Sequence, residues 1–169
     1  RTQGRCLHVL EGHEDFVQGS LLLPDQRILS WSADATISIW DSDTGSLLHT
    51  LSGHEDFIRG TCLLPDQKLL SWSFDASVRI WCLDTMTCLH VYTSNGGHVM
   101  GATPFLHHRI LFWSKDRKFR IWDPQTGQIE EYSAHVAKQD HPSVWEAYTR
   151  SKDNPAPESW STGNRSVLR

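Results

Sequence analysis

The sequence lacks the features that indicate a membrane protein or a cysteine-based metal site. Its 169 residues contain no apolar run of about 18 or more, which excludes a transmembrane helix. The four cysteines (Cys6, Cys62, Cys82 and Cys88) show no CxxC spacing, so neither zinc binding nor a redox motif is expected. The first residue is Arg rather than Met, and no charged-then-apolar leader follows it. We therefore expect a cytoplasmic protein without membrane contact, in which the cysteines stay reduced.

A strong excess of either charge is also absent. The formal net charge is −4, from 16 Lys and Arg against 20 Asp and Glu. Five of the basic residues lie within 109–120 ("RILFWSKDRKFR"). Such a cluster can contact phosphate, but a solvated strand face is the commoner arrangement. We expect no nucleic-acid partner.

What the sequence does contain is an internal repeat of 41 residues. The segments 12–40 and 53–81, which both begin with "GHED", align without a gap and are identical at 19 of 29 positions. A second shift of 41 lands on "RILFWSKDRKFRIW" (109–122), again without a gap. The equivalent tryptophans are Trp40, Trp81 and Trp122 in one series and Trp31, Trp72 and Trp113 in the other.

The pattern within each repeat predicts four short β-strands. In the first repeat, "FVQGSLLL" precedes the turn "PDQ", "RILSWS" precedes the tight turn "ADA", and "TISIW" precedes a turn that ends in Gly45. "SLLHTL" is the fourth strand. One such unit cannot bury both of its faces alone, so the units must pack on one another. The predicted fold class is all-β, with four-stranded antiparallel sheets.

The order Gly-His, Ser-x-Ser-x-Asp and Ile-x-Ile-Trp-Asp ("IWD", 39–41) resembles the WD-repeat family of β-propellers, and "LLLPDQRILSWS" resembles its bacterial members. The resemblance covers 5–133 and implies a ring of four-stranded blades around a central channel. We therefore expect 1–169 to be a single WD-repeat array of about four blades. Its expected parts are the fourth strand of a preceding or closing blade (5–11), repeat one (12–52), repeat two (53–93), repeat three (94–133) and a degenerate, incomplete repeat four (134–169).

The ends of this array leave the size of the ring open. Residues 5–10 either complete a fourth blade in a closed ring or belong to a larger propeller, which the missing Met favours. A third arrangement is self-association, in which two chains share one ring. In repeat four, "SVWEAYT" is the expected first strand, and "ESWSTGNRSVLR" (158–169) aligns with 29–40.

The resemblance also implies a hydrogen-bonded network in each blade. Its members are His13, Ser30, Asp34 and Trp40 in repeat one, and His54, Ser71, Asp75 and Trp81 in repeat two. Chemically, Asp accepts from the imidazole, whose other nitrogen meets the Ser hydroxyl, and that hydroxyl accepts from the indole N–H. Repeat three keeps Asp116 and Trp122 but has Asn95 for His and Phe112 for Ser. We expect a looser blade there, held mainly by packing.

The stretch "SNGGHVMG" (94–101) contains a histidine out of step with this network. The gapless register places His98 opposite Phe16 and Phe57, three residues away from the position of His13 and His54. The alternative is a shifted loop in which His98 still reaches Asp116.

The sequence contains no convincing catalytic constellation. The hydroxyls of Ser30 and Ser71 are expected to be buried against Trp, so they are not nucleophiles. His135 and His141 lack a third ligand, and we expect no metal and no cofactor. "SADATISIW" superficially resembles the Asp-box of sialidase propellers, but Ala or Arg replaces its Gly and its Trp falls one residue late. We expect no enzyme activity.

The expected function is a rigid scaffold that binds protein partners through a loop face. The alternative is a sensor or regulatory propeller attached to a separate enzymatic or effector domain, with a sialidase-like enzyme ranked last. The expected protein-binding face consists of Glu14, Asp15, Glu55, Asp56, Phe74 and Lys115. Phe74 stands where the other repeats have Ala33 and Lys115, and it is either an interface anchor or a cover for the neighbouring blade.

Overall fold

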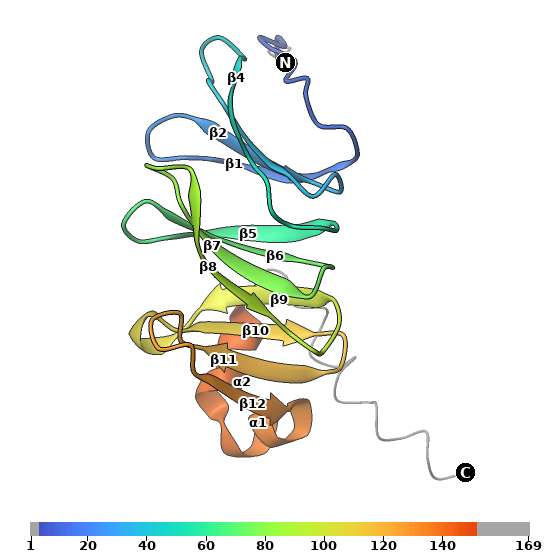
Figure 1. Cartoon of the computed structure of the whole chain (residues 1–169), viewed down its shortest axis with the longest axis vertical. Coiled ribbons are helices and arrows are strands. Elements are labelled where there is room, and N and C mark those ends of the chain that lie inside the picture. The colour runs from blue at the N-terminus through green and yellow to red at the C-terminus, as the bar shows by residue number, and fades with distance from the viewer. Residues whose placement is uncertain (1–3, 152–169) are drawn as a thin grey trace, which may run out of the picture.

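The computed structural model describes residues 4–151, which form three four-stranded sheets followed by two short helices (Figure 1). Each sheet is an antiparallel meander in which strands adjacent in sequence pair, and we call each sheet a blade. The predicted all-β fold of four-stranded antiparallel blades is confirmed.

Blade one contains β1 (Val17–Leu22), β2 (Ile28–Ser32), β3 (Ile37–Trp40) and β4 (Leu47–Leu51). Blade two contains β5 (Ile58–Leu64), β6 (Lys68–Ser73), β7 (Ser77–Cys82) and β8 (Thr87–Thr93). Blade three contains β9 (Val99–Pro104), β10 (Ile110–Ser114), β11 (Lys118–Trp122) and β12 (Ile129–Ser133), with a 3-10 turn at Leu106–His108.

An aspartate shapes the tight turn between the second and third strands of each blade. In blade one, Asp34 Oδ1 accepts a hydrogen bond from the N–H of Thr36 at 2.9 Å. Ala35, between them, has a φ of 67°, which is unfavourable for a residue with a side chain, and the aspartate bond helps to offset that cost. The equivalent pairs are Asp75 with Ser77 (2.8 Å) and Asp116 with Lys118 (3.1 Å).

A close approach of backbone to indole recurs in the first strand of each blade. An added Cβ at Gly60 would lie 2.3 Å from Cζ2 of Trp72, which is closer than two carbon atoms can approach. The position therefore requires glycine, because the buried indole lies directly against the backbone. The equivalent pairs are Gly19 with Trp31 (2.3 Å) and Gly101 with Trp113 (2.2 Å).

The blades pack face to face, and the same positions of each blade make the contact. Blade one presents four buried side chains to Ile58, Leu69 and Trp81 of blade two: they are Leu29, Trp31, Ile37 and Ile39. Blade two presents the equivalent four to blade three: they are Leu70, Trp72, Val78 and Ile80. We call this face of each blade its forward face. Figure 1 shows the three blades stacked in chain order.

Two helices, α1 (Ala134–Asp140) and α2 (Pro142–Arg150), cover the forward face of blade three. The four side chains of this face are Leu111, Trp113, Phe119 and Ile121. They pack against Ala137 of α1 and against Val144 and Tyr148 of α2. The ring of Tyr148 lies edge-on to Trp113 and Phe119, with centroid distances of 5.0 and 4.9 Å.

The predicted fourth blade is wrong over 134–150. The expected first strand "SVWEAYT" is part of α2, which begins with Pro142 at its first position, where proline is well tolerated. Val144 and Tyr148 are four residues apart and thus lie on one helical face, which is the face that packs on blade three. The aligned segment 158–169 lies outside the described residues.

The predicted strand at 5–11 joins no sheet within the described residues, and its place in a blade beyond them stays a prediction. Residues 4–16 contain no strand, because no strand of the described chain pairs with them. His8 instead lies against the turn between β3 and β4, where an added Cβ at Gly45 would be 2.9 Å from His8 Cβ.

Blade one leaves its other face open, and the blades at 4–151 do not close a ring. Val17 is 55% exposed, whereas the equivalent Ile58 and Val99, which pack against the preceding blade, are 0% exposed. Leu22, on the same strand as Val17, is also exposed. The stack therefore has one covered end, at the helices, and one uncovered end, at blade one.

Substituting Tyr148 by alanine tests the importance of the helical cover. We expect Tyr148→Ala to lower the free energy of unfolding by about 3 kcal/mol or more, because it removes a fully buried aromatic ring between Trp113 and Phe119. Urea denaturation followed by tryptophan fluorescence measures this change. Gln139→Ala, on the exposed side of α1, is the matched control and should leave the midpoint unchanged. Equal midpoints for both variants would show that the helices do not stabilise blade three.

Candidate interaction face

The loops before the first strands and the tight turns meet at one end of the blades, which we call the loop face. A backbone hydrogen bond of 2.9 Å joins the two elements in every blade. In blade one the N–H of Ala33 donates to the carbonyl of Phe16. The equivalent bonds run from Phe74 to Phe57 in blade two and from Lys115 to His98 in blade three. His98 therefore lies where Phe16 and Phe57 lie in the other blades, as the gapless register predicts.

A polar network lies behind the loop face in blade one. His13 Nδ1 is 2.8 Å from Asp34 Oδ2, and His13 Nε2 is 2.8 Å from Ser30 Oγ. The indole N–H of Trp40 donates to the same Ser30 oxygen at 2.8 Å. A neutral His13 with its proton on Nδ1 satisfies every member, since Ser30 then donates to Nε2 and accepts from Trp40.

Blade two contains the same network with nearly the same distances. His54 Nδ1 lies 2.8 Å from Asp75 Oδ2, and its Nε2 lies 2.8 Å from Ser71 Oγ. The Trp81 indole donates to Ser71 at 2.8 Å. Ser77 adds a hydroxyl 3.0 Å from His54 Nδ1.

Hydrogen bonds keep both turn aspartates ionised. Burial raises the pKa of Asp34, but bonds from the Thr36 hydroxyl, the Glu14 N–H and His13 outweigh burial and lower that pKa to about 2. In blade two, burial likewise raises the pKa of Asp75. Hydrogen bonds from His54 and Ser77 outweigh this effect and hold the pKa of Asp75 well below its usual range.

Blade three has ion pairs in place of the histidine. Arg120 Nη2 donates to Asp116 Oδ2 at 2.6 Å, and Arg120 Nε donates to Glu131 at 2.9 Å. Arg120 is buried, and although burial alone would lower its pKa, the two carboxylates raise it above the usual value. Asp116 is therefore held by a cation from β11, and His98 does not bond to it. Sequence reasoning missed Arg120. The equivalent positions hold Ser38 in blade one and Arg79 in blade two, so an arginine at this place did not by itself indicate the ion pairs.

The predicted network members Asp116 and Trp122 are not joined in a chain like that of the first two blades. Phe112 offers no hydroxyl to the Trp122 indole, whose ring packs instead near Tyr92 at a centroid distance of 5.9 Å. Packing thus takes the place of the serine at this point in blade three.

The aromatic side chains of the loop face form a row. Phe74 lies parallel to Phe57, with centroids 6.1 Å apart, and its centroid is 4.6 Å from that of His98. His98 Nδ1 also donates to the Phe74 carbonyl at 2.6 Å. Phe74 is therefore half-buried and contacts the neighbouring blade.

Phe16 is the most exposed aromatic of this row. It is 78% exposed, compared with 39% for Phe57, because Ala33 stands where blade two has the Phe74 ring. Sequence reasoning did not single out Phe16. The sequence did contain a signal for its exposure. Blade one pairs Phe16 with the small residue Ala33, whereas the other two blades have a large residue, Phe74 or Lys115, at the position of Ala33.

The acidic residues of the loop face play two different parts. Asp15 and Asp56 each accept the N–H of the following phenylalanine at 2.7 Å, so they shape the loop. Glu14 and Glu55 are exposed, and their N–H groups donate to the turn aspartates Asp34 and Asp75 at 2.9 and 3.0 Å. The exposed Lys115 stands on blade three, where the repeat has Gly96 and Gly97 in place of the carboxylates. The loop face is thus acidic over blades one and two and basic over blade three.

The network serines have a structural role and are not nucleophiles. Ser30 Oγ lies between His13 and Trp40, in a buried position from which it cannot attack a substrate. Within residues 4–151, no group of three His, Cys, Asp or Glu side chains could hold a metal ion. Neither helix of this region is long and apolar enough to cross a bilayer.

Comparison with known proteins agrees with the arrangement of the first two blades. The WD domain, G-beta repeat (WD40) family matches residues 4–41 and 45–82. The chain carries WD40 repeats. A curated relative, the transcriptional repressor rco-1 of Neurospora crassa, is 49% identical over 43 residues, which are 25% of this chain and 7% of the relative.

Solved WD40 propellers share the fold over most of the described chain. The β-propeller domain of Doa1 is similar with a TM-score of 0.64 and 25% identity, over 73% of this chain and 43% of that one. The C-terminal WD40 domain of Sif2 is similar with a TM-score of 0.62 and 23% identity, over 73% of this chain and 37% of that one. The present chain thus spans less than half the length of each of these two WD40 structures. WD40 propeller domains generally act as protein-interaction scaffolds and are typically non-enzymatic.

The low pKa of Asp34 makes the stability of blade one pH-dependent. The ionised carboxylate stabilises the fold above the unfolded pKa of about 3.9, and this contribution is lost as pH falls towards about 2. We expect Asp34→Asn to cost about 1–3 kcal/mol at pH 7 and progressively less as pH falls from 4 to 2. Urea midpoints of both proteins across this range measure the difference. Asp43→Asn, at an exposed position, is the control, and a constant cost for Asp34→Asn would contradict the prediction.

Proposed function

We propose that this WD40 array is a non-catalytic platform that binds protein partners through its loop face. The observation that carries the proposal is the pair of exposed rings, Phe16 and Phe57, beside the exposed carboxylates of Glu14 and Glu55. A large aromatic side chain left in solvent loses the stabilisation that burial provides, and exposed apolar groups with a polar rim are typical of binding surfaces.

The chemistry of the loop face indicates the kind of partner. Aromatic rings bind apolar side chains, and Glu14 and Glu55 attract Lys or Arg, whereas Lys115 at the far side repels them. The proposed partner therefore presents an apolar side chain flanked by basic residues. The backbone bonds from Glu14 and Glu55 to the network aspartates keep this loop rigid, which lowers the entropy lost on binding.

The open face of blade one supports a second part of the proposal. Val17 lies where blades two and three bury Ile58 and Val99, so another blade, from the same protein or from a second copy, would complete the stack. A cytoplasmic location and a bacterial origin stay predictions. The sensor alternative and the sialidase-like alternative have no specific support in the described geometry.

Selection of a displayed peptide library on the purified chain tests the loop face. We expect the enriched peptides to combine an apolar or aromatic residue with neighbouring Lys or Arg. Phe16→Ser and Glu55→Lys should each weaken binding of these peptides about tenfold or more, through loss of an apolar contact and through charge reversal.

The control is Asp43→Lys, which makes a matched charge change in an exposed turn at the opposite end of blade one. It should bind the same peptides as the parent chain. Selected peptides that bind Phe16→Ser and Glu55→Lys with unchanged affinity would rule out the loop face as the binding site.

A further inference from the structure

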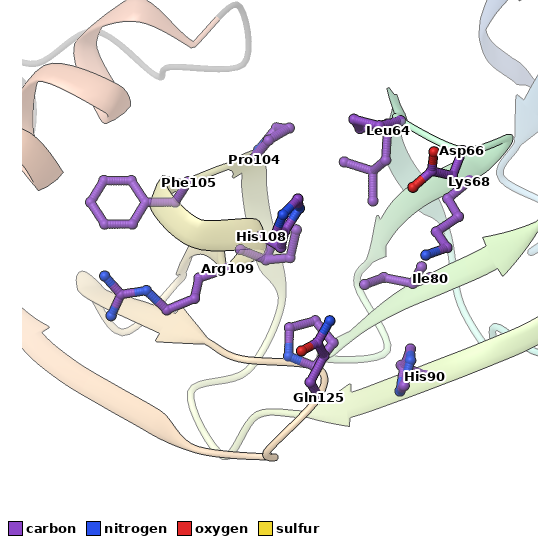
Figure 2. Close-up of a pocket in the computed structure, with 13 residues that line it drawn as sticks. Leu64, Asp66, Lys68, Ile80, His90, Pro104, Phe105, His108, Arg109 and Gln125 are labelled. Atoms are coloured by element: carbon purple, nitrogen blue, oxygen red, sulfur yellow. The ribbon is translucent and has the colours of Figure 1, made fainter.

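A pocket lies at the end of the blades opposite to the loop face, between blades two and three (Figure 2). Its volume is about 450 Å³, which is in the range of pockets that take small molecules. Leu64, Ile80, Pro104 and Ile110 supply apolar walls from both blades. The polar lining consists of Asp66, Lys68, His90, His108, Arg109 and Gln125.

The substitution of a leucine by a proline opens this junction. Between blades one and two, the equivalent space is filled by Leu23 and Leu83, each 1% exposed. Between blades two and three, the corresponding residues are Leu64 and Pro124, and both are only half-buried and line the pocket. Proline is shorter than leucine and cannot reach across the junction, so the space stays open to a ligand.

The lining has also gained positive character relative to the junction of blades one and two. Gln125 stands where blade two has Asp84, and His108 stands where blade two has Gln67. One carboxylate has therefore been removed and an ionisable nitrogen has been added. The remaining carboxylate, Asp66, lies beside Lys68 on the rim in Figure 2.

Lys68 is the cation best placed to hold a ligand. Its equivalents in the other blades already have partners: Arg27 pairs with Asp25 at 2.6 Å, and Arg109 pairs with Glu130 at 3.2 Å. Among residues 4–151, no ion pair joins Lys68 to a carboxylate. Figure 2 shows its side chain extending from β6 towards Ile80, which brings the ammonium group next to the apolar wall.

We propose that this pocket binds a small organic anion, a carboxylate or phosphate monoester carried on an apolar body. The ammonium group of Lys68 holds the anionic group, with Gln125 and His108 as further hydrogen-bond partners. Ile80 and Ile110 contact the apolar body. A charged hydrogen bond beside an apolar wall is stronger than the same bond in open water.

Titration calorimetry with four probes tests the proposal. Phenylacetate and phenyl phosphate should both bind the chain, and the tighter one identifies the preferred head group. Benzyl alcohol, which lacks the charge, and inorganic phosphate, which lacks the apolar body, should each bind at least about tenfold more weakly.

Variants taken from the repeat itself provide the matched controls. Pro124→Leu restores the side chain of blade two and should abolish binding, while Gln125→Asp restores its carboxylate and should weaken binding about tenfold. Lys68→Met should weaken binding by a similar factor. Arg27→Met, the same change at the other junction, should leave the affinity unchanged.

Circular dichroism checks that each variant keeps the fold. The proposal is overturned if neither aromatic anion binds at millimolar concentration, or if folded Pro124→Leu and Lys68→Met bind as the parent chain does. Equal affinity for benzyl alcohol would also overturn it, since the charge would then play no part.

Discussion

The structure depends on covering the forward face of every blade. Each forward face carries four large apolar side chains, and burying one such side chain stabilises a protein by roughly 1.5–3 kcal/mol. In water a lone blade would forgo most of this stabilisation, so the fold of each blade depends on its neighbour. The indole of Trp72 shows how tight this arrangement is: it packs on Gly60 within its own sheet and on blade three beyond it.

The forward face specifies the shape and polarity of its cover but not the kind of element that supplies it. A sheet covers this face in blades one and two, whereas in blade three two short helices cover it with Ala137, Val144 and Tyr148. Phe119 stands where the other blades have Ile37 and Val78, and its ring meets that of Tyr148 edge-on. A helix pair can thus end a stack of blades because apolar contact is not directional.

This explains how far the sequence could predict the fold. The three blades followed from the repeat because their turn and packing residues recur at the same spacing. The helices did not, because the alignment of "ESWSTGNRSVLR" (158–169) with 29–40 suggested a fourth repeat, and alternating residues in "SVWEAYT" are compatible with a strand. Pro142 and the four-residue spacing of Val144 and Tyr148 were the competing signals for a helix. Similarly, the network serines and histidines were predictable by resemblance, whereas Arg120 acts through two acidic partners that only the folded sheet brings to it.

The differences between repeats are therefore more informative about function than their similarities. Where repeats one and two agree, as in the network of His13 and of His54, the residues hold the blade together. Where they differ, the change leaves a surface feature: Ala33 in place of Phe74 exposes Phe16 on the loop face. At the other end, Pro124 in place of Leu83 opens the junction beside Lys68. Because the scaffold repeats, one small substitution creates a feature at a single junction without disturbing the packing of the others.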